Sequence, residues 1–278
     1  MYYLCNIFKL IIIFYTWTIL IFRVYTADIP TSEFSFIATY ADNTAILVTS
    51  SDPGTTSNKL QERLDTIQNW FHRGRIHVNK TKSNHIIFIN KKIICPSVYL
   101  NSKIIPYSDS VKYLGLHLDA KINWKNHIEK KKNELNIKYK KNVLVVGKKN
   151  SQLAIKTKVL LYKSMLKPIW SYSCQIWGAA SESNINKIQR ALSKILRWIA
   201  NAPWYVSNAS LHSDLLVPSV REVILHSSNK HIKKIENHPN TSAITLLYNS
   251  EVYRRLKKTH VLDTEKGSIL KNWKVKLK

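Results

Sequence analysis

Two short apolar runs, at residues 36–40 and 44–48, flank an Asp-Asn pair near the start of the chain. This pattern is typical of a tight β-hairpin, and it predicts that Asp42 and Asn43 lie at or beside the turn. A carboxylate on a hairpin tip is well placed to bind a metal ion. Asp and Asn also tolerate turn dihedral angles without any further role. From these residues alone, the simple turn is the favoured interpretation.

The hydrophobic spacing that follows predicts one helix and more hairpins. Apolar residues recur at intervals of four, three and four on one helical face: Leu60, Leu64, Ile67 and Phe71. Gly74 would close this helix. A second hairpin is predicted over residues 98–105, and residues 111–117 predict a single strand. Residues 34–118 therefore indicate an α+β unit.

From residue 121 the pattern becomes helical. One helix is predicted to begin at Ser151 and to end before Pro168, and it carries four apolar residues: Leu153, Leu160, Leu161 and Met165. The clearest helix covers residues 183–200, with an apolar stripe on one face: Ile185, Ile188, Leu192, Ile195 and Ile199. Its opposite face carries a basic stripe: Lys187, Arg190, Lys194 and Arg197. Shorter helical patterns follow at 220–235 and 248–256.

The net charge of the chain indicates which class of partner it binds. The chain has 43 Lys and Arg against 17 Asp and Glu, a formal net charge of +26. Such a surface attracts polyanions, of which nucleic acid is the commonest, with an anionic membrane surface as the competing partner. The basic stripe of residues 183–200 fits a solvated face and a nucleic-acid contact equally well. Trp198 lies near it and would suit base stacking.

The first 24 residues are very apolar. Residues 10–22 form a run without any charge, shorter than the roughly 20 residues that span a bilayer. A buried core element, a signal-anchor and the start of a truncated reading frame all remain open, and we favour the last. Three widely separated cysteines form no zinc-binding spacing and favour a reducing, intracellular compartment.

Tyr40-Ala41-Asp42-Asn43 resembles the Tyr-Ala-Asp-Asp box of reverse transcriptases, with Asn in place of the last Asp. Its surroundings are similar to those of the jockey-type polymerases of non-LTR retrotransposons. The matching segments occur in the family's order: Tyr25-Thr26-Ala27-Asp28-Ile29-Pro30, Thr44-Ala45-Ile46-Leu47, Asn79-Lys80-Thr81-Lys82, Val111-Lys112-Tyr113-Leu114-Gly115-Leu116, Trp124-Lys125-Asn126-His127-Ile128, Leu161-Tyr162-Lys163, Leu166-Lys167-Pro168-Ile169-Trp170, Gln175-Ile176-Trp177-Gly178, Ile188-Gln189-Arg190 and Ala202-Pro203-Trp204-Tyr205. Each segment alone is weak, but the ordered series is highly specific.

The resemblance implies a fold and an activity. Residues 25–118 would be a partial polymerase palm of antiparallel hairpins and a helix, and 119–206 a basic all-α thumb. A helical extension at 207–278 would follow, and the whole would be the truncated C-terminal part of the polymerase. The implied reaction is RNA-templated DNA synthesis on a DNA primer, with Mg²⁺ and no small-molecule cofactor, in the nucleus or cytoplasm.

The resemblance also assigns roles residue by residue. Asp42 matches a metal-binding carboxylate, and Asn43 occupies the position of the second one. Lys82 matches the basic residue near the phosphates of the incoming nucleotide. A further group matches the hairpin that grips the primer: Tyr113, Leu114 and Gly115.

The sequence departs from the family at the metal site. The family's third carboxylate belongs to a strand several dozen residues upstream, yet residues 1–24 contain no Asp or Glu. One carboxylate of three is not expected to hold two Mg²⁺ ions tightly, so we expect no polymerisation. A palm without its central strands is also expected to expose hairpin edges. The alternatives are a non-catalytic basic nucleic-acid-binding protein and a protein anchored to a membrane through residues 10–22.

Overall fold

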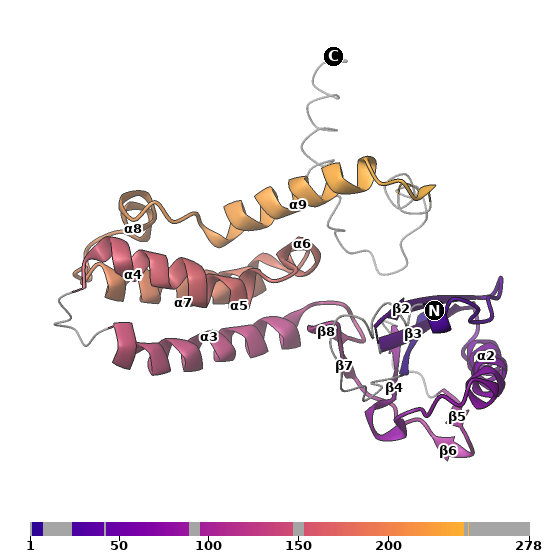
Figure 1. The fold of residues 1–278 in the computed structure, drawn as a ribbon. Helices are drawn as coiled ribbons and strands as arrows, with labels where there is room; N and C mark the ends of the chain where they lie inside the picture. Colours follow the sequence, from indigo (N-terminus) through magenta and orange to yellow (C-terminus); the bar gives the residue numbers. More distant parts are fainter. Residues whose placement is uncertain are drawn as a thin grey trace, which may run out of the picture. The chain divides into compact units, whose positions relative to one another are not determined.

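The computed structural model describes residues 2–7, 24–41, 43–88, 95–146, 153–241 and 244. The chain forms two compact units, residues 1–122 and 123–278 (Figure 1). In the described residues the first unit carries the strands, and the second is helical. The chain is therefore an α+β protein, and the helical unit begins where lysine becomes abundant in the sequence. The finer division into palm, thumb and extension remains a prediction.

A four-stranded antiparallel sheet organises the first unit, with the strand order β2-β3-β1-β4. Its strands are β1 (Tyr2–Ile7), β2 (Ser35–Tyr40), β3 (Asn43–Thr49) and β4 (Asn84–Phe88). The predicted hairpin is confirmed, because β2 and β3 pair up to Tyr40 and Asn43 and the chain reverses between those two residues.

Strand β1 comes from the apolar N-terminal segment and lies between β3 and β4. Leu4 pairs with Leu47 on one side and with Ile86 on the other. The expected edge of the hairpin is therefore found at β2, the outer strand of the sheet, and not at β3, which is paired on both sides. Aromatic and branched residues favour strands, and the composition of β1 suits an interior position. Residues 10–22 lie outside the described residues.

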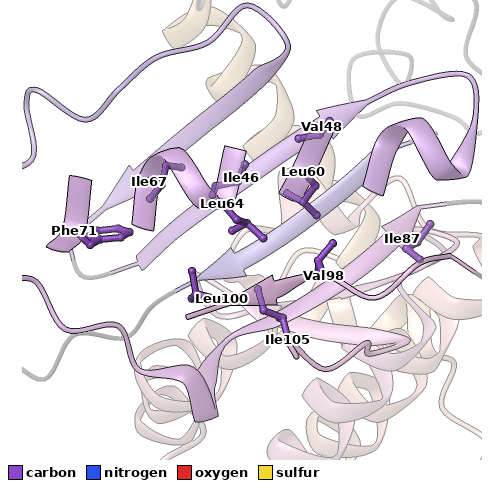
Figure 2. Close-up of a cluster of buried hydrophobic side chains, with 10 residues drawn as sticks. All are labelled: Ile46, Val48, Leu60, Leu64, Ile67, Phe71, Ile87, Val98, Leu100 and Ile105. Carbon is purple, nitrogen blue, oxygen red and sulfur yellow. The ribbon is translucent and has the colours of Figure 1, made fainter. Parts of the chain in front are cut away.

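Helix α2 (Pro53–Arg73) confirms the predicted helix after the hairpin. It begins at Asp52, whose side chain accepts a hydrogen bond from the Thr55 amide at 2.9 Å, and Gly74 caps its end. Its apolar face packs against the sheet and the neighbouring hairpin, as Figure 2 shows. The buried cluster contains Ile46, Val48, Leu60, Leu64, Ile67, Phe71, Ile87, Val98, Leu100 and Ile105.

Two small hairpins follow a short 3-10 turn, η1 (Lys80–Lys82). They consist of β5 (Tyr99–Leu100) with β6 (Lys103–Ile104), and of β7 (Ser110–Tyr113) with β8 (Leu116–Asp119). The first was predicted. The second corrects the single strand that the local pattern predicts at 111–117 and agrees with the hairpin that the resemblance implies there, because Leu114 and Gly115 both have positive φ angles, 44° and 80°, and reverse the chain. Such a pair of dihedral angles is the type I′ pattern of two-residue hairpins.

The second unit is helical throughout its described residues. Its elements are α3 (Lys125–Val146), α4 (Ile155–Leu161), the π-helical turn η2 (Tyr162–Leu166), α5 (Lys167–Ser171), α6 (Cys174–Trp177), α7 (Glu182–Ile199), α8 (Asn208–Asp214) and α9 (Val220–Glu236). Helix α7 lies between α3 and α9 (Figure 1). None of the helices in the described ranges is long and apolar enough to cross a membrane.

The region around Pro168 differs from the prediction. The helix does not end before this residue but continues through η2 into α5, where Pro168 lies in the first turn. Proline lacks the backbone N–H that a continuous helix would use, and the π-helical turn directly before it already interrupts the regular hydrogen-bond ladder. Apolar residues predicted for this helix are exposed, among them Leu160 and Met165, and Tyr162 and Trp170 are buried instead. Ser151 and the predicted helix at 248–256 lie outside the described residues.

Helices α7 and α9 confirm their predicted positions. The predicted apolar stripe of α7 is buried along its whole length, from Ile185 to Ile199. Helix α9 begins at Ser219, whose hydroxyl accepts from the Glu222 amide while the Glu222 carboxylate accepts from the Ser219 amide. This reciprocal capping fixes the start of α9.

Candidate functional site

Strand register brings three features to one end of the sheet in the first unit. Ile7, the last residue of β1, pairs with Thr44 next to the hairpin turn. Asn6 pairs with Asn84, the first residue of β4. The end of β1, the tip of the β2–β3 hairpin and the start of β4 therefore lie at the same end of the sheet, which is called this edge below. Because β1 separates β3 from β4, those two strands lie two strand spacings apart, about 10 Å.

Two of the predicted site residues can be placed at this edge. Asn43 is the first residue of β3 and is half-buried, whereas Asp42 lies outside the described residues. Lys82 is exposed at the end of η1, two residues before β4 begins. The preceding loop is held locally, since the Asn79 carboxamide oxygen accepts from the Thr81 amide at 3.1 Å and from its hydroxyl at 2.7 Å. Asn43 and Lys82 thus lie at the same end of the sheet, and their roles remain predictions.

The donor atoms at this edge do not fit a pair of Mg²⁺ ions. Mg²⁺ prefers anionic oxygen ligands, and β1, the strand beside the hairpin, contains no carboxylate in its sequence. Asn43 can offer only a neutral amide oxygen. Within the described part of the chain, no group of three or more His, Cys, Asp or Glu side chains lies close enough to hold a metal ion.

The three residues assigned to primer contact lie together on the β7–β8 hairpin. Tyr113 ends β7, and Leu114 and Gly115 form the two-residue turn. Tyr113 is half-buried, and this burial raises the pKa of its phenol. The hairpin is anchored on β4 through a small apolar cluster that includes Ile86 and Val111. A turn of this kind holds its residues in a defined position on the sheet.

A buried histidine ties β4 to the segment around the β5–β6 hairpin. His85 contacts the Ile105 carbonyl through Nδ1 at 3.0 Å, and its backbone accepts from the Ser108 amide at 3.0 Å. Burial lowers the pKa of His85, although the bond to Ile105 partly opposes this effect. The neutral ring, with its Nδ1–H donating to the carbonyl, is therefore favoured. The sequence offered no signal that singled out this residue.

The basic stripe of α7 separates into residues with different environments. Lys187 is paired with Glu129 of α3 at 3.0 Å, and this hydrogen bond holds the pKa of the Glu129 carboxyl below its ordinary value. Trp198 is half-buried, with its ring edge-on to Tyr139 at 5.6 Å between centroids. Both Lys187 and Trp198 thus contribute to the packing of α7 on α3. The role of the basic stripe in nucleic-acid contact remains a prediction.

The other three basic residues face outward or hold a loop. Arg190 and Lys194 are exposed. Arg197 donates to the backbone carbonyls of Pro203 and Val206, the latter at 2.7 Å, and to the Asn208 side chain at 3.1 Å. Its guanidinium therefore fixes the connection between α7 and α8. Sequence spacing put the four residues on one face but could not identify these partners.

Comparison of the sequence with known proteins finds several relatives. No protein-family model and no solved structure matches the chain. The chain is 33% identical over 259 residues to the RNA-directed DNA polymerase from mobile element jockey of Drosophila melanogaster, covering 87% of this chain and 28% of that protein. It is 30% identical over 249 residues to the probable RNA-directed DNA polymerase from transposon X-element of the same species, covering 88% of this chain and 27% of that protein.

A third relative, the probable RNA-directed DNA polymerase from transposon BS of Drosophila melanogaster, is 29% identical over 249 residues. It matches 86% of this chain and 27% of its own length. The ordered motifs and these matches point to the same proteins, so the resemblance is confirmed. Over most of its length the chain is therefore similar to a part of the jockey-like RNA-directed DNA polymerases of non-LTR retrotransposons, and it spans about 28% of the length of the curated relatives it matches.

Proposed function

We propose that this chain is a polymerase fragment that binds nucleic acid without catalysing DNA synthesis. The observation that carries the proposal is strand β1, which lies directly beside the Tyr40–Asn43 hairpin and brings no carboxylate to it. Of the two acidic positions in the box that the chain resembles, only Asp42 is retained, and Asn43 occupies the other. A single carboxylate does not supply the negative charge that two closely spaced divalent cations require. The proposal therefore assigns no metal-dependent step to this chain.

The charge of the second unit supports the nucleic-acid-binding half of the proposal. Lysine and arginine side chains are exposed along α3 and α7: Lys125, Lys130, Lys138, Lys140, Lys141, Arg190 and Lys194. Cationic side chains that neutralise phosphates release the counterions condensed on the strand, which drives binding. The ligands proposed from the family are an RNA template and a DNA primer, and the proposed location is the nucleus or cytoplasm.

Binding is expected to weaken steeply as salt increases. For a single strand, log K should fall with log salt by about 0.7 for each contacted phosphate. Fluorescence anisotropy of a labelled oligonucleotide with the full chain measures this slope. Replacing Arg190 and Lys194 by Gln should make the slope shallower. Lys187→Gln is the matched control, because Lys187 already pairs with Glu129 and should contribute little. A salt-independent affinity, or no binding at all, would contradict the proposal.

Primer extension tests the other part of the proposal, the absence of DNA synthesis. With a primed RNA template, deoxynucleotides and Mg²⁺ or Mn²⁺, the wild-type chain is expected to give no template-dependent incorporation. Asn43→Asp should also remain inactive, because it restores one carboxylate while β1 still offers none. Incorporation that disappears in Asp42→Ala would refute the absence of catalysis and leave the binding proposal untouched.

A further inference from the structure

The loop between α7 and α8 presents two aromatic side chains at the surface. Trp204 is 88% exposed and Tyr205 is 71% exposed. They are consecutive residues of a turn in which the Val206 amide donates to the Pro203 carbonyl at 3.3 Å. Burial of large aromatic surface is favourable. Two such rings at the tip of one turn therefore indicate a contact surface.

Arg197 holds this turn from within. Its guanidinium donates to the Pro203 and Val206 carbonyls on the two sides of the aromatic pair and to the Asn208 side chain. The Ala202 amide donates back to the Arg197 carbonyl at 2.9 Å. The turn is thus fixed before any partner arrives, and a fixed surface loses less conformational entropy on binding than a flexible one.

The geometry of the two rings limits what they can contact. Their centroids are 6.0 Å apart and their planes meet at 82°. Nearly perpendicular rings in contact cannot sandwich one flat ligand between them, so each ring offers a separate stacking face. Unpaired nucleobases suit such faces, because every base has a π-face and stacking depends little on sequence. In a duplex the bases are stacked on one another and unavailable.

The neighbouring charge favours the same partner. Lys194 lies one helical turn before Arg197 on the same face of α7, and Arg190 lies a further turn away. At a rise of about 1.5 Å per residue, this exposed cationic row extends roughly 10 Å from the turn. Cations beside stacking faces form the combination that binds the backbone and the bases of a single strand.

We propose that Trp204 and Tyr205, held by Arg197 and followed by Lys194 and Arg190, form a docking surface for single-stranded nucleic acid. This inference rests on the proposed nucleic-acid binding and adds the location of the contact and a preference for unpaired bases. Arg197 acts here as a positioning residue, and the two rings make the contact.

The test compares a labelled oligothymidylate with a duplex of the same length, using anisotropy with the full chain. The double variant Trp204→Ala with Tyr205→Ala should bind the single strand about 100-fold more weakly, at roughly tenfold for each lost stacking contact. Binding of the duplex should stay at the wild-type level. The salt slope should be unchanged, because stacking releases no phosphate counterions. Phe36→Ala, which removes an exposed aromatic side chain of the first unit, should bind like the wild type.

Two conservative variants separate contact from positioning. Trp204→Phe keeps a stacking face and should retain most of the single-strand affinity. Arg197→Lys keeps the charge but cannot donate to all three acceptors, so single-strand affinity should fall about tenfold without a change in salt slope. Arg73→Lys is its matched control, because Arg73 is an exposed arginine at the end of α2 in the first unit and lies outside the proposed docking surface. Circular dichroism of each variant should show an intact helical fold.

The possible results separate a failure of the proposed docking surface from a failure of the proposed nucleic-acid binding. If the wild type binds with a steep salt dependence and the double variant binds single strands equally well, the docking surface is wrong and the proposed function stands. Equal losses for duplex and single strand also overturn it. So does a double variant that loses self-association in sedimentation but keeps strand binding, because the rings would then contact a second copy. If the wild type binds no nucleic acid, both proposals fail.

Discussion

Replacing Leu4 with proline is expected to unfold the first unit. Leu4 lies in the middle of β1 and pairs with Leu47 of β3 and Ile86 of β4. Proline has no backbone N–H and cannot donate to the ladder, so it is essentially confined to edge strands and bulges. The free energy of unfolding should fall by about 3 kcal/mol or more, the scale at which proline disrupts the interior of a regular element. Urea unfolding followed by circular dichroism would measure the loss.

Leu4→Val provides the matched control. Valine keeps the backbone N–H and has a strong preference for strands, so this variant should lose only about 0.5–1.5 kcal/mol, the usual cost of removing one methylene group. A proline variant as stable as the valine variant would show that β1 is not an interior strand. The same result would remove the observation that carries the proposed absence of catalysis. The experiment therefore tests the fold and the function together.

Helices with a clear apolar stripe were predictable because their contacts are periodic. Leu60, Leu64 and Ile67 recur at helical spacing and are buried in α2, and the stripe of α7 behaves in the same way. The hairpin at 98–105 was predictable because Asn101 and Ser102 are turn residues between two apolar runs. In each case the information lies within about 20 consecutive residues.

The features that were missed depend on distant contacts or on one weak local signal. Strand β1 has partners about 40 and 80 positions along the chain, and its sequence merges with the apolar run that follows. The β7–β8 turn was implied by the resemblance but not by the local pattern, because apolar residues flank Gly115, which is the only turn signal there. The π-helical turn before Pro168 shifts the helix phase, which a constant period of 3.6 residues cannot describe.

The basic residues of α7 also have tertiary partners that sequence spacing could not identify. Spacing placed Lys187 and Arg197 on one face of a helix, which is correct. Their partners, however, are Glu129 in another helix and carbonyls in the following loop. Two of the four residues assigned to nucleic-acid contact are thus engaged in holding the second unit together. A face defined by periodicity therefore needs tertiary contacts before its side chains can be assigned to binding.

Gly178→Ala is expected to destabilise the second unit strongly, for a reason that no local pattern contains. Gly178 is buried at the end of α6, where α6 packs against α9. A Cβ atom at this position would lie 2.4 Å from Cγ2 of Ile224 and 2.6 Å from the Cys174 carbonyl oxygen. Overpacking of this kind costs about 3 kcal/mol. The φ angle of Gly178 is −62°, so the cost comes from the close approach of the helices and not from backbone strain.

A double-mutant cycle with Ile224 identifies the clash. Ile224→Ala alone should also destabilise, by about 2–5 kcal/mol, because it empties a buried position. The double variant should be less destabilised than the sum of the two single variants, since the alanine at 224 no longer carries Cγ2. Rescue should remain partial because the Cys174 carbonyl is still in place. Gly54→Ala, where the added Cβ meets only the Asp52 side chain at 3.1 Å, should change stability little. Strict additivity at 178 and 224 would show that the two helices do not meet at Gly178.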